Sequence, residues 1–356
     1  MDENAKNGAV RLFHRRDPEK TELLDESRRE NDVRAAYLIE DGGTKTVLKL
    51  AANAFTTPRR VEGWAGLIRE TRERGLYSPA FLPSLRGRLA ETFEADGVRY
   101  VVWEEEFAPY EIAMGRGEDE DAYRTRAASR PRTEDGSRPI WQKELILFYA
   151  ELGAAHLRGD WGSSLYVRLE APEGEETDEV EECARLFEGD LLKRFPALSD
   201  RWGEIRRRWE GIRDALAGVW PNLPSSVFQA DWNDSNVLLT ADGHFAGLID
   251  YNLAGEDKVL NMALSIGTYG FCSGGGGGDD VERVRDVLAL FASRYDWNRD
   301  ERAAAPLLWH YLNDLYWSEV QDLEKARTED EAAAVLDRVE RSLGRSVSFD
   351  DVMGRR

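Results

Sequence analysis

Residues 227–239 read VFQADWNDSNVLL and, after an Asp-Gly turn, residues 245–251 read FAGLIDY. The first stretch carries Asp231 and Asn236 on a polar loop that leads into an apolar run, and the turn predicts a hairpin. The second strand of this hairpin ends at Asp250. The pattern therefore brings two carboxylates and one amide together at one end of a hairpin.

These side chains offer hard oxygen donors. Mg²⁺ takes one or two carboxylates in proteins and completes its shell with water and phosphate oxygens. Asn236 and Asp250 can hold such a metal, while Asp231 stays free to accept a proton, and this division of labour is the one that phosphoryl transfer uses. The alternative is that Asp231 and Asn236 only cap a turn and that Asp250 only ends a strand.

The pattern D-x-x-x-x-N followed by I-D resembles the catalytic core of the aminoglycoside phosphotransferase and choline kinase-like family. That family's loop reads H-G-D-x-x-x-x-N and its metal motif reads I-D-[FYW]. The resemblance implies an α+β, protein-kinase-like two-lobed fold, with a small antiparallel-sheet N-lobe and a mostly helical C-lobe. By this resemblance Asp231 is the catalytic base, and Asn236 and Asp250 are ligands of Mg²⁺.

The resemblance also implies an activity. The family transfers the γ-phosphoryl group of ATP or GTP to a hydroxyl of a small molecule. For this chain the acceptor remains open among an aminoglycoside, a choline-like alcohol, a sugar and an amino-acid alcohol, and a cationic acceptor would suit the acidic chain. A protein kinase is disfavoured, because the sequence lacks a D-F-G motif and an activation-loop signal.

One feature departs from the family pattern: Gln229-Ala230 stands where His-Gly is usual. The His of the family props the catalytic loop, and a Gln can donate a similar hydrogen bond. A second hypothesis follows from this departure, namely a catalytically silent pseudokinase that binds a nucleotide or a partner. The presence of Lys49 together with Asp231, Asn236 and Asp250 favours the enzyme.

A kinase needs a strand lysine over the phosphates and a helix glutamate that holds it. Lys49 lies inside the apolar strand 45–50, where an unpaired ammonium would be costly. Glu62 and Glu70 both lie on the following helix, and the resemblance favours Glu62 as the partner. The alternative for Lys49 is an edge-strand lysine that reaches out to water.

The remaining nucleotide contacts rest on the resemblance alone. Ser27 and Arg28 take the place of the family's phosphate-covering hairpin turn, although the glycines of a protein-kinase loop are absent. The segment with Glu104 and Glu106 ends the small sheet and corresponds to the hinge, whose backbone reads the edge of the base. The alternative for this segment is an ordinary acidic strand end.

The chain divides into three predicted parts: an N-terminal arm over 1–30, an N-lobe over 31–107 and a helical C-lobe over 108–356. The C-lobe begins with a charged insert, 114–139, that reads as a mobile linker. We expect strands over 35–40, 45–50, 87–94 and 98–105, with one helix between Thr57 and Gly75. Further helices are expected over 141–158, 177–193, 199–218, 280–295, 301–326 and 329–343.

The amino-acid composition limits the kinds of partner that the protein can bind. The 356 residues carry a net charge of −20, which disfavours binding to nucleic acid because phosphate backbones would be repelled. Two distant cysteines, the lack of a signal-like start and the lack of a long apolar run predict a cytoplasmic protein without a membrane segment. The protein is expected to be a monomer or a homodimer.

Overall fold

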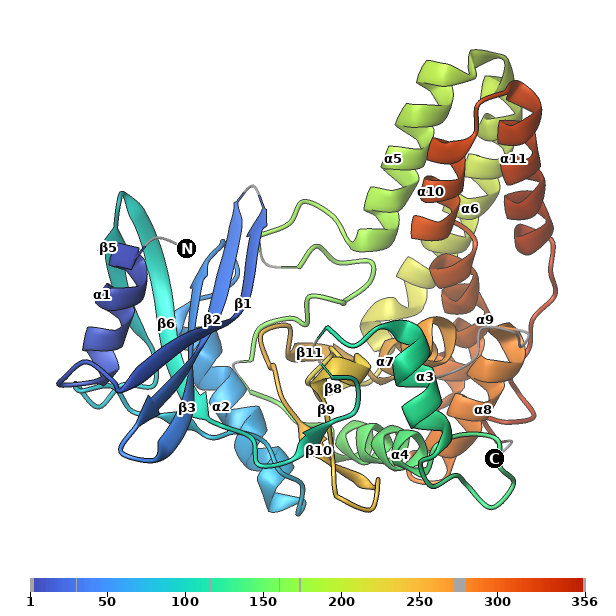
Figure 1. The fold of residues 1–356 in the computed structure, drawn as a ribbon. Helices are drawn as coiled ribbons and strands as arrows, with labels where there is room; N and C mark the ends of the chain where they lie inside the picture. The colour runs from blue at the N-terminus through green and yellow to red at the C-terminus, as the bar shows by residue number, and fades with distance from the viewer. Residues whose placement is uncertain are drawn as a thin grey trace. The chain divides into compact units, whose positions relative to one another are not determined.

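The computed structural model describes residues 3–29, 31–115, 117–159, 161–172, 174–271 and 280–354. The chain forms two compact units. Unit 1 comprises Met1–Pro131, Gly159–Ser163 and Gln229–Gly255, and unit 2 comprises Arg132–Arg158, Ser164–Phe228 and Glu256–Arg356. Figure 1 labels the helices and strands of the chain.

Unit 1 contains an antiparallel sheet in the order β1-β2-β3-β6-β4, and β5 also pairs with β6. The strands are β1 (Lys20–Arg29), β2 (Asp32–Asp41), β3 (Thr44–Ala52), β4 (Phe81–Leu82), β5 (Glu91–Ala95) and β6 (Val98–Glu106). The strands predicted over 35–50 and 87–105 therefore share one sheet. This arrangement confirms the small antiparallel sheet of the predicted fold.

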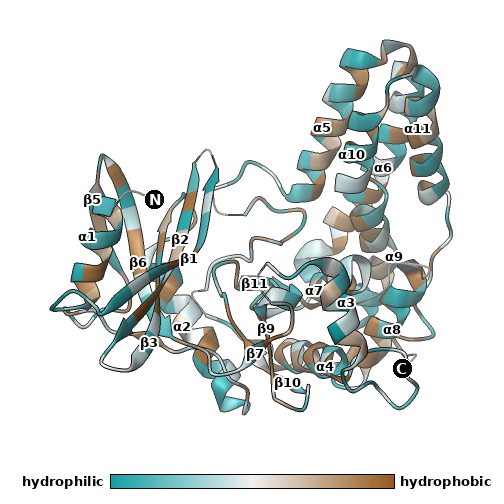
Figure 2. Cartoon of the chain, viewed as in Figure 1, coloured by the Kyte–Doolittle hydropathy of each residue, from teal (hydrophilic) through white to brown (hydrophobic). Residues whose placement is uncertain are grey.

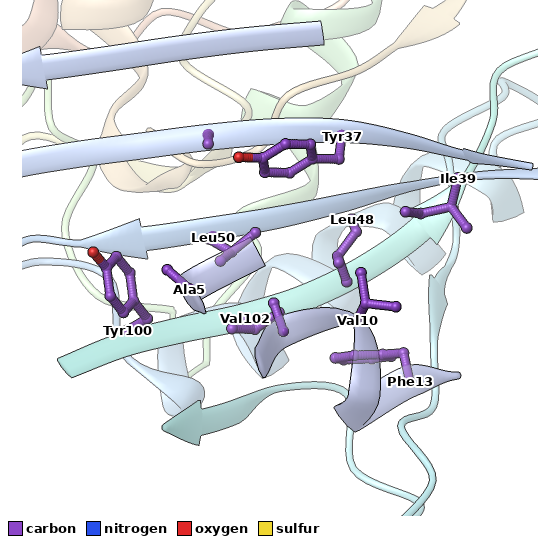
Figure 3. Close-up of a cluster of buried hydrophobic side chains, with 11 residues drawn as sticks. Ala5, Val10, Phe13, Tyr37, Ile39, Leu48, Leu50, Tyr100 and Val102 are labelled. Carbon is purple, nitrogen blue, oxygen red and sulfur yellow. The ribbon is translucent and has the colours of Figure 1, made fainter. Parts of the chain in front are cut away.

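Helix α1 (Glu3–Phe13) packs on one face of this sheet, as Figure 3 shows. Its buried residues recur at helical spacing and contact Tyr37, Leu48 and Val102 from three strands. The described residues of the predicted arm, 3–29, therefore form α1 and most of the edge strand β1 within unit 1, and the prediction of an arm is wrong there. The apolar stripe of α1 consists of Ala5, Ala9, Val10 and Phe13.

Helix α2 (Pro58–Glu73) begins where the sequence predicted it. The Thr57 side chain accepts a hydrogen bond from the Arg60 amide. Trp64 of this helix contacts Trp103 of β6 with ring centroids 5.7 Å apart. Val102 belongs to the apolar cluster that packs against α1. Because successive side chains of a strand point to opposite faces of the sheet, Trp103 lies on the other face.

The predicted hairpin is formed by β9 (Val237–Leu239) and β10 (Phe245–Leu248), with β7 (Glu111–Ile112) beside β9. The segment after α2 holds this hairpin, since the Tyr77 amide donates to the Ala246 carbonyl and the Leu248 amide donates to the Tyr77 carbonyl. Gly247 lies at this crossing with φ +157°, and a Cβ there would stand 1.7 Å from the Tyr77 oxygen. Only glycine allows so close an approach.

Unit 2 is mostly helical, and its helices carry both polar and apolar residues along their length (Figure 2). They are α4 (Ile140–Ala155), α5 (Glu179–Arg194), α6 (Ser199–Val219), α7 (Val259–Tyr269), α8 (Asp280–Ala292), α9 (Arg299–Asn313), α10 (Trp317–Lys325) and α11 (Glu329–Leu343). Two short strands, β8 (Ser225–Phe228) and β11 (Gly255–Lys258), pair with each other. The helical C-terminal part of the predicted fold is confirmed.

Three local predictions differ from the structure. The insert over 114–139 contains a helix, α3 (Glu120–Ala128), whose first turn is capped by Asp119. The single helix expected over 301–326 is two helices, α9 and α10. Helix α7 was not predicted. No helix among the described residues has the length and apolar character that crossing a membrane requires.

Candidate active site

Unit 1 contains a cavity of about 620 Å³ that collects most of the predicted site residues. Lys49, Asp231, Asn236 and Asp250 all line it. The large sheet contributes residues from β1, β2, β3 and β6, and the other lining residues come from the segments after α2 and β6, the loop that carries Asp231 and the end of the hairpin. The remaining lining residues are Leu24, Asp25, Ala36, Val47, Pro79, Glu105, Glu106, Phe107, Ala108, Tyr110, Ile112, Met114, Asn233, Ser235 and Ile249.

Gln229 anchors the loop that carries Asp231. Its side-chain Nε2 donates to the carbonyl of Ile249 at 2.9 Å and to the carbonyl of Asp250 at 2.7 Å, and its Oε1 accepts from the Asp231 amide at 2.9 Å. Gln229 is 1% exposed. One buried amide therefore ties the backbone of Asp231 to the backbone of Asp250, which is the propping role that the resemblance gives to a His.

The backbone on both sides of this anchor is unusual. Ala230 has φ +69° and Asp250 has φ +59°. Non-glycine residues adopt such angles at a cost, and they persist where surrounding contacts hold them. Tyr251, which follows Asp250, is buried and hydrogen-bonds Ser78 at 2.6 Å and Thr71 at 3.2 Å. The aromatic residue of the I-D-[FYW] motif thus fixes the end of the hairpin.

The carboxylate of Asp231 has the electrostatics of a base. Burial, and then the nearby carboxylate of Asp250, raise the pKa of Asp231 to about 6. The side-chain amide of Asn233 donates to the Asp231 Oδ1. A pKa near 6 leaves Asp231 largely ionised at neutral pH and more basic than an ordinary aspartate.

Asn236 and Asp250 form a donor set that suits Mg²⁺. The Ile249 amide donates to the Asn236 carbonyl at 3.0 Å, which joins the two strands beside the cavity. The Asn236 Nδ2 donates to the Asp231 carbonyl at 3.2 Å, which leaves its Oδ1 as the available ligand atom. One carboxylate and one amide oxygen fit a metal that takes its other ligands from water and phosphate.

Lys49 pairs with two carboxylates across the cavity. Its Nζ lies 3.0 Å from the Glu105 Oε1 and 3.2 Å from the Asp250 Oδ1. Burial alone would lower the pKa of Lys49, but Asp250 and Glu105 together raise it above its usual value. Lys49 therefore stays protonated and places a positive charge at the cavity.

The expected pair between Lys49 and Glu62 is not formed. Glu62 is exposed on α2, and Glu105 of β6 provides the glutamate instead. The reason is the strand register, which places Lys49 opposite Trp103, so that Glu105 lies two residues further along the same face. Glu70 pairs with Arg74 on its own helix.

The prediction for the phosphate-covering turn also needs correction. Arg28 is exposed and pairs with Glu26, and Ser27 does not line the cavity. Leu24 and Asp25, earlier on β1, line it instead. The strand β1 thus contributes to the cavity, but through other residues than the two that the resemblance indicated.

Of the two predicted hinge residues, only Glu106 lines the cavity. Its carboxylate accepts from Arg72 at 2.9 Å and from the Ala80 amide at 3.2 Å. The Glu104 side chain is buried on the opposite face, where it contacts Thr46 and pairs with His14. No hydrogen bond joins the backbone of Phe107 or Ala108 to another described residue, and both line the cavity.

The chain resembles known proteins in part of its sequence and in its fold. No protein-family model matches the chain. The homoserine kinase of Caulobacter sp. (strain K31) is 33% identical over 126 residues, which are 32% of this chain. The match spans 39% of the length of that curated relative.

Solved structures match over nearly the whole chain. A microcompartment-associated aminopropanol kinase has a TM-score of 0.51 at 15% identity, covering 96% of this chain and 95% of that one. An amicoumacin kinase in complex with AMP-PNP and Ca²⁺ has a TM-score of 0.53 at 16% identity, covering 97% and 94%. A spectinomycin phosphotransferase with ADP has a TM-score of 0.50 at 10% identity, covering 96% and 94%. The chain has the fold of the protein-kinase-like small-molecule phosphotransferases.

Two residues of the site were missed by the sequence reasoning. Glu105 stands in a run of three glutamates, 104–106, and only the register of β3 and β6 shows which of them faces Lys49. Nothing in the sequence indicated that Asp25 lines the cavity, because this residue stands ahead of the first predicted strand. The role of Gln229 was open in the sequence, and its contacts now show how it holds the loop.

Proposed function

We propose that the protein is a kinase that transfers the γ-phosphoryl group of ATP to a hydroxyl of a small molecule. The observation that carries this proposal is the meeting of Lys49, Asp231, Asn236 and Asp250 at one cavity of unit 1. These residues supply the groups that phosphoryl transfer requires: a cation for the phosphates, a metal-binding pair and a base.

In this proposal the residues have separate roles. Lys49 binds the α- and β-phosphates with its ammonium. Asn236 and Asp250 hold Mg²⁺, which would neutralise charge on the phosphates. Asp231 orients the acceptor hydroxyl and takes its proton as the new O–P bond forms and the bond to the departing diphosphate oxygen breaks. The hydrogen bonds of the Gln229 side chain hold the backbone of Asp231 in place relative to the backbone of Asp250.

The nucleotide base is assigned to the wall formed by Glu106, Phe107 and Ala108. The backbone groups of Phe107 and Ala108 have no described partner, and such groups can read a purine edge. ATP is favoured as donor because two of the solved structures named above, the amicoumacin kinase and the spectinomycin phosphotransferase, contain AMP-PNP and ADP. GTP stays the alternative donor.

The acceptor is proposed to be a small amino alcohol or hydroxy amino acid. The support comes from the relatives, since the sequence match is named a homoserine kinase and one structural match is named an aminopropanol kinase. Larger aminoglycoside-like acceptors form the second class, supported by the spectinomycin phosphotransferase match.

The test is a screen for phosphoryl transfer. The purified protein is incubated with Mg²⁺ and either ATP or GTP, and with one acceptor at a time from four groups: hydroxy amino acids, amino alcohols, choline-like alcohols and aminoglycosides. Release of nucleoside diphosphate and a new phosphomonoester signal in ³¹P NMR are both recorded. The Asp231→Asn variant serves as the matched control for contaminating kinases.

Turnover that depends on one acceptor and disappears in Asp231→Asn would support the proposal. Binding of nucleotide without phosphorylation of any acceptor would contradict it and favour the pseudokinase. The contacts of Gln229 argue against the pseudokinase, because the residue that departs from the family pattern still makes the hydrogen bonds that hold the loop.

A further inference from the structure

The loop between Asp231 and Asn236 contacts a helix that lies outside the recognised motif. Asp234 of this loop is 1% exposed, and its carboxylate accepts a hydrogen bond from the hydroxyl of Tyr123. Tyr123 belongs to α3 and is itself fully buried. Because a buried carboxylate without hydrogen-bond donors costs free energy, this contact joins α3 firmly to the loop.

Helix α3 is in turn fastened to the short strand β7. The Arg126 Nη2 donates to the Ala113 carbonyl at 3.0 Å, and the Arg130 Nη1 donates to the same carbonyl at 2.9 Å. Both arginines also pair with Glu111 of β7, at 2.6 Å and 3.1 Å. The hydroxyl that α3 presents to the loop therefore has a defined place.

The same part of the chain holds the backbone of the loop. Asn236 ends a single turn of 3₁₀ helix, Asp234–Asn236. The Met114 amide donates to the Asp234 carbonyl at 3.0 Å, and the Ala113 amide donates to the Val237 carbonyl at 2.8 Å. These two backbone contacts bracket the turn, and the hydrogen bond from α3 holds the side chain of its first residue. A shift of Asp234 would therefore move Asn236, two residues further on.

The position of this turn matters for a metal. Mg²⁺ demands nearly ideal octahedral geometry, so that a displaced ligand weakens its binding. Groups that orient a ligand without touching the metal are often as necessary as the ligand itself. The contacts of α3 thus give the charged insert over 114–139 a place in the construction of the site.

We propose that Tyr123 is a positioning residue of the metal site. Through the buried carboxylate of Asp234 it fixes the turn that carries Asn236, and it thereby strengthens the binding of Mg²⁺ between protein and nucleotide. This inference rests on the proposed function, which takes Asn236 and Asp250 as the metal ligands. Tyr123 is not among the described residues that line the cavity, so it acts through the loop and not on the nucleotide.

The test measures ATP binding and not turnover. Titration calorimetry of the full chain gives the Kd of ATP in EDTA and at a series of free Mg²⁺ concentrations. Tyr123→Phe removes one hydroxyl and keeps the ring. The matched control is Thr125→Ala, which removes an exposed hydroxyl of the same helix that donates to the Asp121 carbonyl.

The two variants should differ in their response to the metal. We expect Tyr123→Phe to raise the free Mg²⁺ concentration needed for tight ATP binding roughly tenfold to hundredfold, the range for loss of a group that orients a metal ligand. Its Kd for ATP in EDTA should stay within about twofold of wild type, and Thr125→Ala should change neither quantity by more than that.

A double-mutant cycle shows whether Tyr123 acts through Asp234. In an Asp234→Ala background, Tyr123→Phe should add less than about twofold, because residues of one hydrogen-bond network do not act additively. Thermal melting shows whether each variant is folded. The result for Tyr123→Phe alone decides the matter if Asp234→Ala does not fold.

The outcomes separate this inference from the proposed function. If the ATP affinity of the wild type does not respond to Mg²⁺, the proposed metal site is wrong and the inference falls with it. If the wild type responds and Tyr123→Phe responds at the same Mg²⁺ concentrations, the inference alone is overturned. An equal loss of ATP affinity with and without Mg²⁺ in Tyr123→Phe would also overturn it, because that result indicates a general structural role.

Discussion

The side-chain amide of Gln229 donates a 2.7 Å hydrogen bond to the backbone carbonyl of Asp250, although the two residues stand on different strand ends. The same side chain accepts from the Asp231 amide. The position of Asp231 relative to Asp250 therefore depends on one buried glutamine. This explains how a chain without the usual His-Gly pair can keep the geometry of the loop.

Replacing Gln229 should reduce turnover more than nucleotide binding. Gln229→Leu removes the donors to Ile249 and Asp250 and lets the loop shift, and misplacement of about 1 Å can cost on the order of 100-fold in rate. We expect kcat to fall about 10- to 100-fold, with the nucleotide Kd changed by less than about threefold. Steady-state kinetics and titration calorimetry measure the two effects.

The matched variant is Gln229→His. An imidazole can donate one of the lost hydrogen bonds and restores the family's residue, so most of the turnover should return. Similar activity in Gln229→Leu and wild type, or no recovery in Gln229→His while the fold is retained, would show that Gln229 does not position the loop.

Asp231→Asn should act on the chemical step. The amide keeps the shape of the side chain but cannot take a proton, and general-base contributions are typically about 10²–10⁴-fold. Turnover should fall by that factor while nucleotide affinity stays nearly intact. Single-turnover kinetics on a confirmed acceptor checks this, and a wild-type rate in Asp231→Asn would rule out the assignment.

The raised pKa of Asp231 predicts an acidic limb in the pH profile. The base must be ionised to accept a proton, so the rate should fall about tenfold per pH unit below about 6 and level off above about 7. Burial and then Asp250 raise the pKa of Asp231, and hydrogen bonds from Asn233 and Asn236 partly offset this rise. The profile of kcat/KM from pH 5 to 8 measures the midpoint, and Asp231→Asn should lose the limb.

Metal removal should weaken nucleotide binding through Asn236 and Asp250. With Mg²⁺ present, ATP should bind the wild type more tightly than after EDTA treatment, because in the proposed site the metal would join the phosphates to these two side chains. In Asp250→Ala the effect of EDTA should largely vanish. Equal ATP affinity in all four conditions would contradict the metal site.

Several parts of the fold were readable from local signals. Thr57 and Pro58 mark the start of α2, and the Asp-Gly turn marks the hairpin of β9 and β10. The spacing of Asp231, Asn236 and Asp250 places all three at the cavity, because a tight hairpin leaves little freedom for its ends. Helix α1 also had a signal, the apolar stripe from Ala5 to Phe13, which was overlooked.

Other features depend on pairing between distant segments. The side chains of the three glutamates at 104–106 point alternately to the two faces of β6. Only the register with β3 determines that Glu105 lies on the face of Lys49 and that Glu104 lies on the opposite face. A shift of one residue would exchange these roles. The partner of Lys49 could therefore not be chosen from the sequence, and the resemblance led to Glu62.

The pairing of Lys49 gives a final prediction. Glu105→Gln keeps the shape of the side chain but removes the charge, which leaves Lys49 drawn toward Asp250 alone. Because the lysine would then be displaced from the phosphates, we expect the KM for ATP to rise about tenfold, the loss of roughly one charge-assisted contact. Glu62→Gln, on the exposed face of α2, is the matched control and should stay within about twofold of wild type, as surface substitutions usually do. If Glu62→Gln raises the KM and Glu105→Gln does not, the helix glutamate holds the lysine when nucleotide is bound, and the pairing with Glu105 does not serve catalysis.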